Sequence, residues 1–72
     1  ALEDRILRHL VSNRGAVCTK EDIIRSVWGD DFTSEGTLTV HVRRLRARIE
    51  RKPDSPAYIR TVWGRGYLFE AS

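Results

Sequence analysis

The sequence predicts an α+β domain in which three helices are followed by a C-terminal β-hairpin. In three separate segments of residues 2–52, apolar residues recur every three to four positions, which is the spacing of an amphipathic helix. Residues 57–70 are instead rich in β-branched and aromatic residues around two central glycines, a pattern typical of a hairpin. Pro53 and Pro56 separate the two regions, because proline does not continue a helix.

The first helix is expected from about residue 2 to residue 13, with apolar positions at Leu2, Ile6, Leu7 and Leu10. Gly15 favours the left-handed conformation found at helix C-termini, and we expect it to end this helix. Residues 16–18 then form a short extended link. Cys18 is the single cysteine of the chain, which rules out an intrachain disulfide, and it is expected to be a small buried hydrophobic residue.

The second helix is expected to span about nine residues between Thr19 and Gly29. The run from Thr19 to Asp22 has the form of a capping box, with Asp in place of the usual Glu at the fourth position. Residues 29–35 form an acidic loop with one aromatic residue, Phe32. We interpret Phe32 as a plug that packs beneath this loop, in preference to an exposed contact residue.

The third helix, capped by Ser34 and expected to extend to about Lys52, carries the main functional signal. One stripe at helical spacing is apolar and expected to be buried: Leu38, Val42, Leu45 and Ile49. The opposite side carries a small apolar centre among arginines: Val40, Arg43, Arg44, Ala47 and Arg51, with Thr39 and Arg46 on one flank. Glu50 is the only acidic residue between positions 37 and 52, whereas a simple solvated face interleaves acids and bases.

This arginine-rich face has the chemistry of a surface that reads nucleic acid. The guanidinium fork matches phosphate oxygens and the O6 and N7 edge of guanine, and Val40 is the kind of group that contacts a thymine methyl. The net charge is only +3, but it is unevenly distributed. Residues 1–35 carry five basic and seven acidic side chains, whereas residues 36–66 carry eight basic and two acidic. A positive field confined to one region is expected of a binding footprint.

Three helices with a basic third helix, followed by a hairpin, make up a winged helix-turn-helix. In this fold the third helix enters the major groove of DNA, the second crosses the backbone, and the hairpin is the wing. The wing tip carries Trp63 and Arg65. At 72 residues the chain is expected to be one domain, residues 1–72.

Other functional classes find little support in the sequence. It holds no Ser/His/Asp, paired-carboxylate or glycine-rich phosphate-loop pattern, so we expect neither an enzyme nor a cofactor or metal site. No apolar run approaches the roughly 18–20 residues that span a membrane. The lone cysteine fits a reducing cytoplasm.

Three blocks of the sequence resemble one family of bacterial regulators. They are Val27-Trp28-Gly29, the run from Leu38 to Arg46, and the run from Ile59 to Tyr67. Their order and spacing are similar to those of the effector domain of OmpR/PhoB response regulators, and the similarity covers nearly all of residues 2–70. The resemblance implies sequence-specific binding of double-stranded DNA for transcription regulation, within a two-component system.

The resemblance also implies a longer protein and several partners. A phosphorylatable receiver domain and a four-stranded sheet would precede the first helix, and both are missing from this chain. Because the sequence starts at Ala1 without methionine, we expect a fragment of a longer regulator. Family members bind direct-repeat promoter sites as tandem homodimers in the cytoplasm, and they contact RNA polymerase through the loop that matches residues 29–35.

Family DNA contacts in the third helix can be carried over residue by residue. Arg43, Arg44 and Arg46 match positions that reach bases or phosphates. Val40 matches an apolar contact in the major groove, and Thr37 matches a DNA-contacting position at the start of the recognition helix. The resemblance therefore implies that one continuous helix face reads the DNA.

Three further contacts are implied outside that helix. Lys20 and the indole N–H of Trp28 match phosphate contacts, and Thr61 matches a wing residue near the DNA backbone. Most of the Trp28 ring is expected in the core, with its N–H at the surface. From its place near the predicted end of the third helix, Arg51 is expected to contact the DNA backbone as well.

The sequence departs from the family pattern at four positions. Thr39 stands where Asp is common, Gly36 where a charged residue is frequent, and Asp4 where an aromatic residue is usual. Trp63 stands where an Arg often enters the minor groove, which makes Arg65 the candidate for that contact. A neutral Thr39 hydroxyl replaces one potential acceptor for a base amino group.

A winged-helix module that binds proteins without reading DNA is the alternative function, because some members of this fold bind protein partners. The two functions differ in their response to salt. A phosphate-driven DNA reader loses affinity steeply as salt rises, whereas a protein-docking surface need not.

Overall fold

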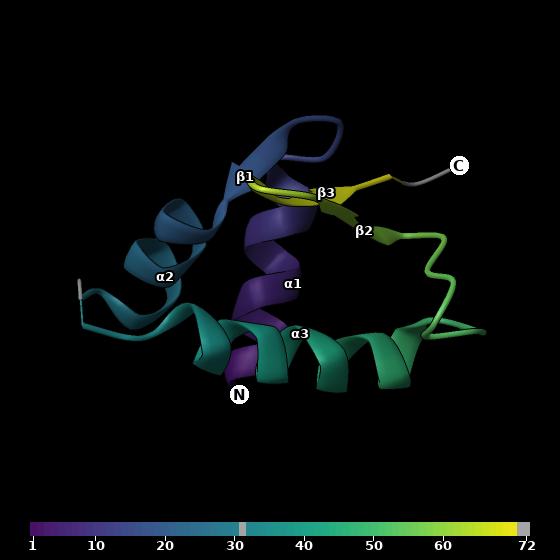
Figure 1. The fold of residues 1–72 in the computed structure, drawn as a ribbon, viewed down its shortest axis with the longest axis horizontal. Helices are drawn as coiled ribbons and strands as arrows, with labels where there is room; N and C mark the ends of the chain where they lie inside the picture. The colour runs from purple at the N-terminus through teal and green to yellow at the C-terminus, as the bar shows by residue number, and fades with distance from the viewer. Residues whose placement is uncertain (31, 71–72) are drawn as a thin grey trace.

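The computed structural model describes residues 1–30 and 32–70, which form three helices and one three-stranded antiparallel sheet (Figure 1). The helices are α1 (Leu2–Ser12), α2 (Lys20–Trp28) and α3 (Glu35–Ile49), and the strands are β1 (Val17–Thr19), β2 (Ile59–Val62) and β3 (Gly66–Phe69). Helix α1 lies in the middle of the molecule and contacts α2, α3 and β3. The predicted α+β class and the winged helix-turn-helix order of elements are confirmed.

Helix α1 ends one residue earlier than predicted, and its end does not use Gly15. The Asn13 side chain donates from Nδ2 to the His9 carbonyl oxygen at 2.8 Å, and the Asn13 backbone N–H donates to that of Leu10. These bonds satisfy carbonyls that a helix end leaves unpaired. Gly15 does have a positive φ of 84°, but it belongs to the turn into β1, where its N–H donates to the Phe69 carbonyl oxygen.

Helix α2 begins and ends as predicted. The Thr19 hydroxyl accepts the backbone N–H of Asp22 at 3.1 Å, which is the N-cap bond expected of this residue. Gly29 ends the helix in the left-handed conformation, with φ 76°, and its N–H donates to the Ile24 carbonyl oxygen.

Helix α3 begins as predicted but ends three residues early. The Ser34 hydroxyl accepts the backbone N–H of Thr37 at 3.2 Å, which confirms the cap. At the other end Glu50 is extended, and its carboxylate accepts the backbone N–H groups of residues 57–59. The chain therefore leaves the helix at Ile49, and Arg51 and Lys52 lie beyond it.

The wing is the hairpin of β2 and β3, and it is joined to a third strand rather than isolated. The strand order of the sheet is β1-β3-β2, so the predicted link of residues 16–18 is largely a strand, β1, which pairs with β3. Where β3 pairs with β1, a Cβ on Gly66 would lie 2.0 Å from the Cys18 carbonyl oxygen. Only glycine allows the two backbones to approach so closely.

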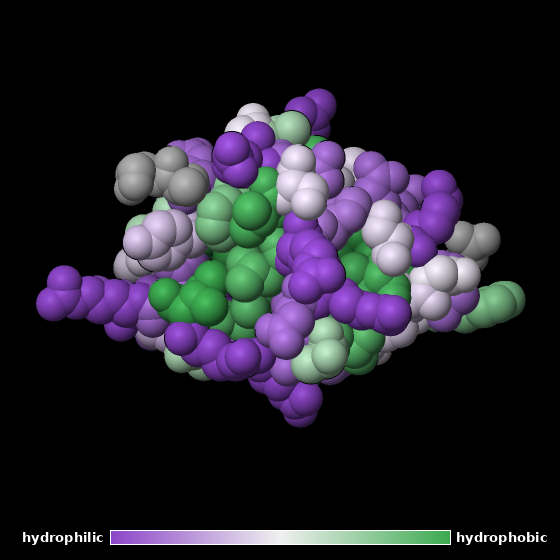
Figure 2. Space-filling model, turned by 180° about the vertical axis from the view of Figure 1, so that it is seen from behind, coloured by the Kyte–Doolittle hydropathy of each residue, from purple (hydrophilic) through white to green (hydrophobic). Residues whose placement is uncertain are grey.

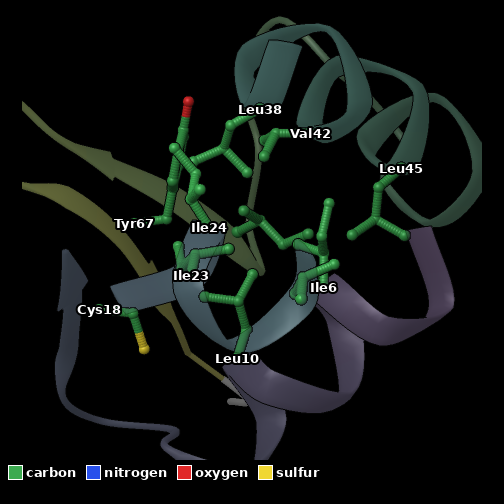
Figure 3. Packing of buried hydrophobic residues seen from close by; sticks show 11 residues of the cluster. Ile6, Leu10, Cys18, Ile23, Ile24, Leu38, Val42, Leu45 and Tyr67 are labelled. Atoms are coloured by element: carbon green, nitrogen blue, oxygen red, sulfur yellow. The ribbon is translucent and has the colours of Figure 1, made fainter. Parts of the chain in front are cut away.

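The core lies where α1, α2 and α3 meet the sheet, and Figure 3 shows its side chains converging from all these elements. Among the described residues, the largest fully buried side chains are Ile6, Leu10, Ile23, Leu38, Val42, Leu45 and Ile59. Cys18 is buried as predicted, and burial raises the pKa of its thiol. Figure 2 shows that hydrophobic surface also reaches the face opposite to that of Figure 1, with hydrophilic side chains around it.

The interpretation of Phe32 as a buried plug is wrong, because 91% of its surface is exposed. The loop is closed by Asp30 instead. One oxygen of the Asp30 carboxylate accepts the backbone N–H groups of Phe32 and Thr33 and the Thr33 hydroxyl, at 2.9–3.0 Å. These bonds, above all those from Thr33, lower the pKa of Asp30. The turn is thus held by polar contacts that do not require the aromatic ring.

Candidate nucleic-acid interface

Helix α3 presents the two faces that its sequence predicts. Leu38, Val42 and Leu45 are buried, and Ile49 is partly buried against the core. On the other side Val40 is 46% exposed, and the residues around it are exposed as well: Thr37, Thr39, Arg43, Arg44 and Ala47. An apolar centre is therefore surrounded by guanidinium groups on an accessible helix surface.

Two residues predicted on or beside this face, Thr39 and Arg51, have surroundings different from those of Arg43 and Arg44. The Thr39 hydroxyl donates to the Glu35 carbonyl oxygen at 2.9 Å, one helical turn back, and keeps its lone pairs available. The assignment of Arg51 to the outward face of the helix is wrong, because the helix ends at Ile49. Arg51 is nevertheless exposed, beside the C-terminal end of α3.

Lys20 and Trp28 lie at opposite ends of α2. Lys20 Nζ is 3.5 Å from Glu35 Oε1, an exposed ion pair that links the starts of α2 and α3. Trp28 is partly buried and packs on the core, as expected, with its ring 5.7 Å from that of His41.

Arg46 and Thr61 bind each other across the space between α3 and the wing. Arg46 Nη2 lies 2.7 Å from the Thr61 hydroxyl oxygen and 2.8 Å from the Ile59 carbonyl oxygen, and Nε donates to the same carbonyl at 3.1 Å. The guanidinium carbon also lies 5.5 Å from the centroid of the Tyr67 ring, within cation–π range. Two predicted DNA contacts are thus joined to each other in the free protein.

Trp63 and Arg65, at the wing tip, border two different grooves. Trp63 is 89% exposed and lines a broad groove of about 940 Å³ between α3 and β2, together with Thr39, Arg43, Arg46, Arg60 and Thr61. Arg65 lines a second groove, of about 410 Å³, together with Thr19 and Lys20 at the start of α2. Gly64 separates the two side chains, with a φ of 78° that allows the tight turn.

Sequence reasoning missed a pair that joins α1 to α3. Glu3 Oε2 lies 2.6 Å from Nδ1 of His41, and this hydrogen bond is the main cause that lowers the pKa of Glu3. The positive charges of Arg44 and Arg48 lower it further. No local sequence signal marks this pair, because its members are 38 positions apart.

Sequence reasoning also missed the role of Glu50, which is only 7% exposed. One signal was available, since Glu50 is the single acid in a basic run. Its partners are backbone groups of residues 57–59, and those cannot be identified from residue types.

The described residues hold no feature that favours a metal or membrane function. Within residues 1–30 and 32–70, no three His, Cys, Asp or Glu side chains are grouped so that they could hold a metal ion. Over the same residues, no helix is both long enough and apolar enough to cross a bilayer.

Comparison with known proteins places the chain in a family. Residues 1–69 match the family model described as "Transcriptional regulatory protein, C terminal". The chain is 47% identical to the transcriptional regulatory protein YrkP of Bacillus subtilis, covering 99% of this chain and 32% of that protein. It is 44% identical to the regulatory protein VanR of Enterococcus faecium, covering 94% of this chain and 30% of that protein. The chain thus spans about a third of the length of these curated relatives.

Solved structures agree with this placement. The response regulator DrrB, an OmpR/PhoB homolog from Thermotoga maritima, superposes with a TM-score of 0.89 at 37% identity, over 97% of this chain and 32% of that one. The DNA-binding domain of Bacillus subtilis CssR superposes with a TM-score of 0.81 at 29% identity, over 97% of this chain and 75% of that one. The chain therefore belongs to the OmpR/PhoB family of C-terminal, DNA-binding domains of transcriptional regulatory proteins.

Proposed function

We propose that this chain is the effector domain of a response regulator and that α3 reads a specific sequence in the major groove of double-stranded DNA. The observation that carries this proposal is the exposed face of α3, where Arg43 and Arg44 flank the half-exposed Val40. The opposite stripe of the same helix is anchored in the core, so the reading face is held on a rigid element. Residues 1–72 would act as one domain within a longer regulator.

The proposed contacts fall into base-reading and backbone-binding groups. Thr39, Val40, Arg43 and Arg44 are assigned to base edges, since they share the exposed face of α3. The backbone group is assigned from the start and end of α2, both ends of α3 and the wing: Lys20, Trp28, Thr37, Arg46, Arg51, Thr61, Trp63 and Arg65. Of these, Arg46 and Thr61 already bind each other in the free protein, so only their remaining hydrogen-bond donors and acceptors can bind DNA.

Salt dependence tests this proposal against the protein-docking alternative. The wild-type chain would be used to select a duplex from a random-sequence pool, and its affinity would be measured over a series of salt concentrations. Each phosphate neutralised by a cationic side chain contributes a slope of about −0.9 to the logarithmic plot. A steep slope together with preference over a scrambled duplex supports the proposal, whereas failure to select any sequence contradicts it.

We further propose that the 29–35 loop contacts RNA polymerase. Phe32 supports this, because its ring is exposed on a turn that Asp30 holds without it. Phe32→Ala should therefore leave DNA affinity and melting temperature unchanged and reduce transcription activation by the full-length regulator in a reconstituted assay. Unchanged activation would contradict the assignment. Asp31 of this loop lies outside the described residues.

The relatives are about three times as long as this chain, which supports the proposal of a preceding receiver domain in a cytoplasmic regulator. Such a protein would bind direct-repeat sites as a tandem homodimer. Footprinting of the full-length protein on its selected site measures the repeat spacing directly. Protection of a single half-site at saturation would contradict the tandem arrangement.

A further inference from the structure

Strand β2 is an outer strand, and its free edge is bound by one side chain of α3 and by the side chain of the residue that follows the helix. Within the part of the chain that the structure describes, the strand order is β1-β3-β2, so β2 has a neighbouring strand on one side only. At Ile59, the first residue of β2, the backbone N–H donates to Glu50 Oε2 at 2.8 Å. The carbonyl oxygen of Ile59 accepts from Arg46 Nη2 at 2.8 Å and from Nε at 3.1 Å. Both polar groups of one backbone residue are thus held by side chains at the C-terminal end of α3 and just beyond it.

Glu50 extends this attachment along the chain that enters the wing. Its carboxylate also accepts the backbone N–H groups of Ala57, at 2.9 Å, and of Tyr58, at 3.2 Å. Hydrogen bonds to an ionised group are about twice as strong as neutral ones. Because Ile59 is fully buried, loss of its bond to Glu50 would also leave a buried backbone N–H group without its acceptor.

The two strands of the wing are held to the body of the protein by different means. Strand β3 pairs with β1, where Gly66 packs directly on the Cys18 backbone. Strand β2 pairs with β3 along its length, and it is held in addition by Arg46, in the last turn of α3, and by Glu50, the residue that follows the helix. Arg46 and Glu50 therefore add a direct link between the C-terminal end of α3 and the start of β2.

We propose that Arg46 and Glu50 are positioning residues that fix the wing relative to α3. The wing and α3 can then contact the same DNA duplex without a further loss of wing flexibility on binding. This inference rests on the proposed DNA-reading function. Once α3 is bound to DNA, the wing adds more affinity if it is already held in the binding orientation, because conformational freedom that is lost on binding lowers affinity. A wing that is more mobile still carries its DNA-contacting residues, but it adds less to DNA affinity.

Glu50→Gln is the decisive variant, since it retains one acceptor oxygen but loses the charge. Asp4→Asn, at an exposed position of α1, is the matched control for the loss of one negative charge. In the free proteins, NMR order parameters of residues 62–66 should fall in Glu50→Gln and remain unchanged in Asp4→Asn. Unchanged order in Glu50→Gln would overturn the proposal without any reference to DNA.

The second measurement is affinity for a duplex that the wild-type chain selects from a random pool. Glu50→Gln should weaken binding about tenfold, within the range of coupling inside one hydrogen-bond network. Arg65→Ala should then cause a smaller loss in the Glu50→Gln background than in wild type. Equal losses in both backgrounds would overturn the proposal. If wild type selects no duplex, the proposed function fails at that first step, before any variant is compared.

Folding is checked by circular dichroism before either measurement. Should Glu50→Gln not fold, Glu50→Asp takes its place, because it keeps the charge but is shorter by one methylene. A purely structural role for Glu50 predicts a lower melting temperature with unchanged wing order and unchanged dependence on Arg65, and that combination would also overturn the proposal.

Discussion

The carboxylate of Glu3 on α1 lies 2.6 Å from Nδ1 of His41 on α3, the helix proposed to read DNA. The two side chains are largely buried, with 20% and 16% of their surface exposed. His41 also faces the Trp28 ring of α2. The pair therefore stands at the junction of all three helices and joins the N-terminal turn of α1 to α3.

Glu3 should contribute stability that depends on pH. The hydrogen bond from His41 holds the pKa of Glu3 below its ordinary value of 4.5. A group with a lowered folded pKa stabilises the fold above its unfolded pKa, and this contribution is lost as pH falls through the folded pKa. Glu3→Gln should thus melt at a lower temperature than wild type at neutral pH, and the difference should shrink once the pH falls below 4.5.

Asp4→Asn is the control for this pH series. Asp4 forms an exposed pair with Arg48, at 3.7 Å, and exposed pairs contribute little. Its melting temperature should follow that of wild type from neutral to acid pH. A constant difference between Glu3→Gln and wild type across the series would show that the Glu3 carboxylate does not act through its ionisation.

Leu45→Ala should destabilise the domain by about 2–5 kcal/mol, the range for truncating a large buried side chain. Leu45 is 1% exposed and lies in the core beneath α3. Val40→Ala, on the exposed face of the same helix, should change stability by less than about 0.5 kcal/mol. Chemical denaturation of both variants measures the contrast, and equal losses would show that the two faces of α3 have been exchanged.

How far the fold could be predicted depended on whether the relevant contacts were local. The Thr19 and Ser34 caps involve residues three positions apart, so the sequence alone was sufficient to find them. Strand β1 was missed, because three residues become a strand only by pairing with β3 near the other end of the chain. Phe32 was misjudged, because hydrophobicity predicts burial but does not reveal that Asp30 closes the loop.

The candidate site shows the same division. The exposed face of α3 follows from helical spacing, and the structure displays it as predicted. The attachment of Glu50 and Arg46 to Ile59 could not be predicted, because their partners are backbone groups and every residue has these. The resemblance to a family indicated that Arg46 and Thr61 matter, but it did not reveal that they bind each other.

Gly66→Ala should be far more damaging than Gly36→Ala. A Cβ at Gly66 would overlap the Cys18 carbonyl oxygen and force β1 away from β3, at a cost of about 1–3 kcal/mol. At Gly36, in the first turn of α3, the nearest atom to a new Cβ is Ser34 Oγ at 3.7 Å. Alanine is the better helix former, so Gly36→Ala should stabilise by up to about 1 kcal/mol. Similar melting temperatures for the two variants would contradict the claim that only glycine fits at position 66 where β3 pairs with β1.

Arg43 and Arg44 should discriminate between sequences, whereas Arg51 should not. Loss of a bidentate contact to guanine costs about 1–3 kcal/mol on the specific duplex and less on a scrambled one. Arg51 lies beyond the helix end, so Arg51→Ala should weaken both duplexes about equally. Competition titrations with the two duplexes measure the ratio. Equal losses on both duplexes for Arg43→Ala and Arg44→Ala would contradict base reading by these residues.

The two wing-tip residues should contribute to DNA binding in different ways. Arg65 is exposed beside Lys20, so its charge would lie next to the proposed phosphate contact of α2. Arg65→Ala should lower affinity, reduce the salt slope by roughly one, and weaken any preference for A·T pairs beside the site. Trp63 lines the same groove as Arg43, so Trp63→Ala should lower DNA affinity. Because Trp63 has no charge, the dependence of affinity on salt should not change. Because Trp63 is almost fully exposed, the melting temperature should not change. Unchanged affinity and salt dependence in Arg65→Ala would show that the wing does not bind DNA through that residue.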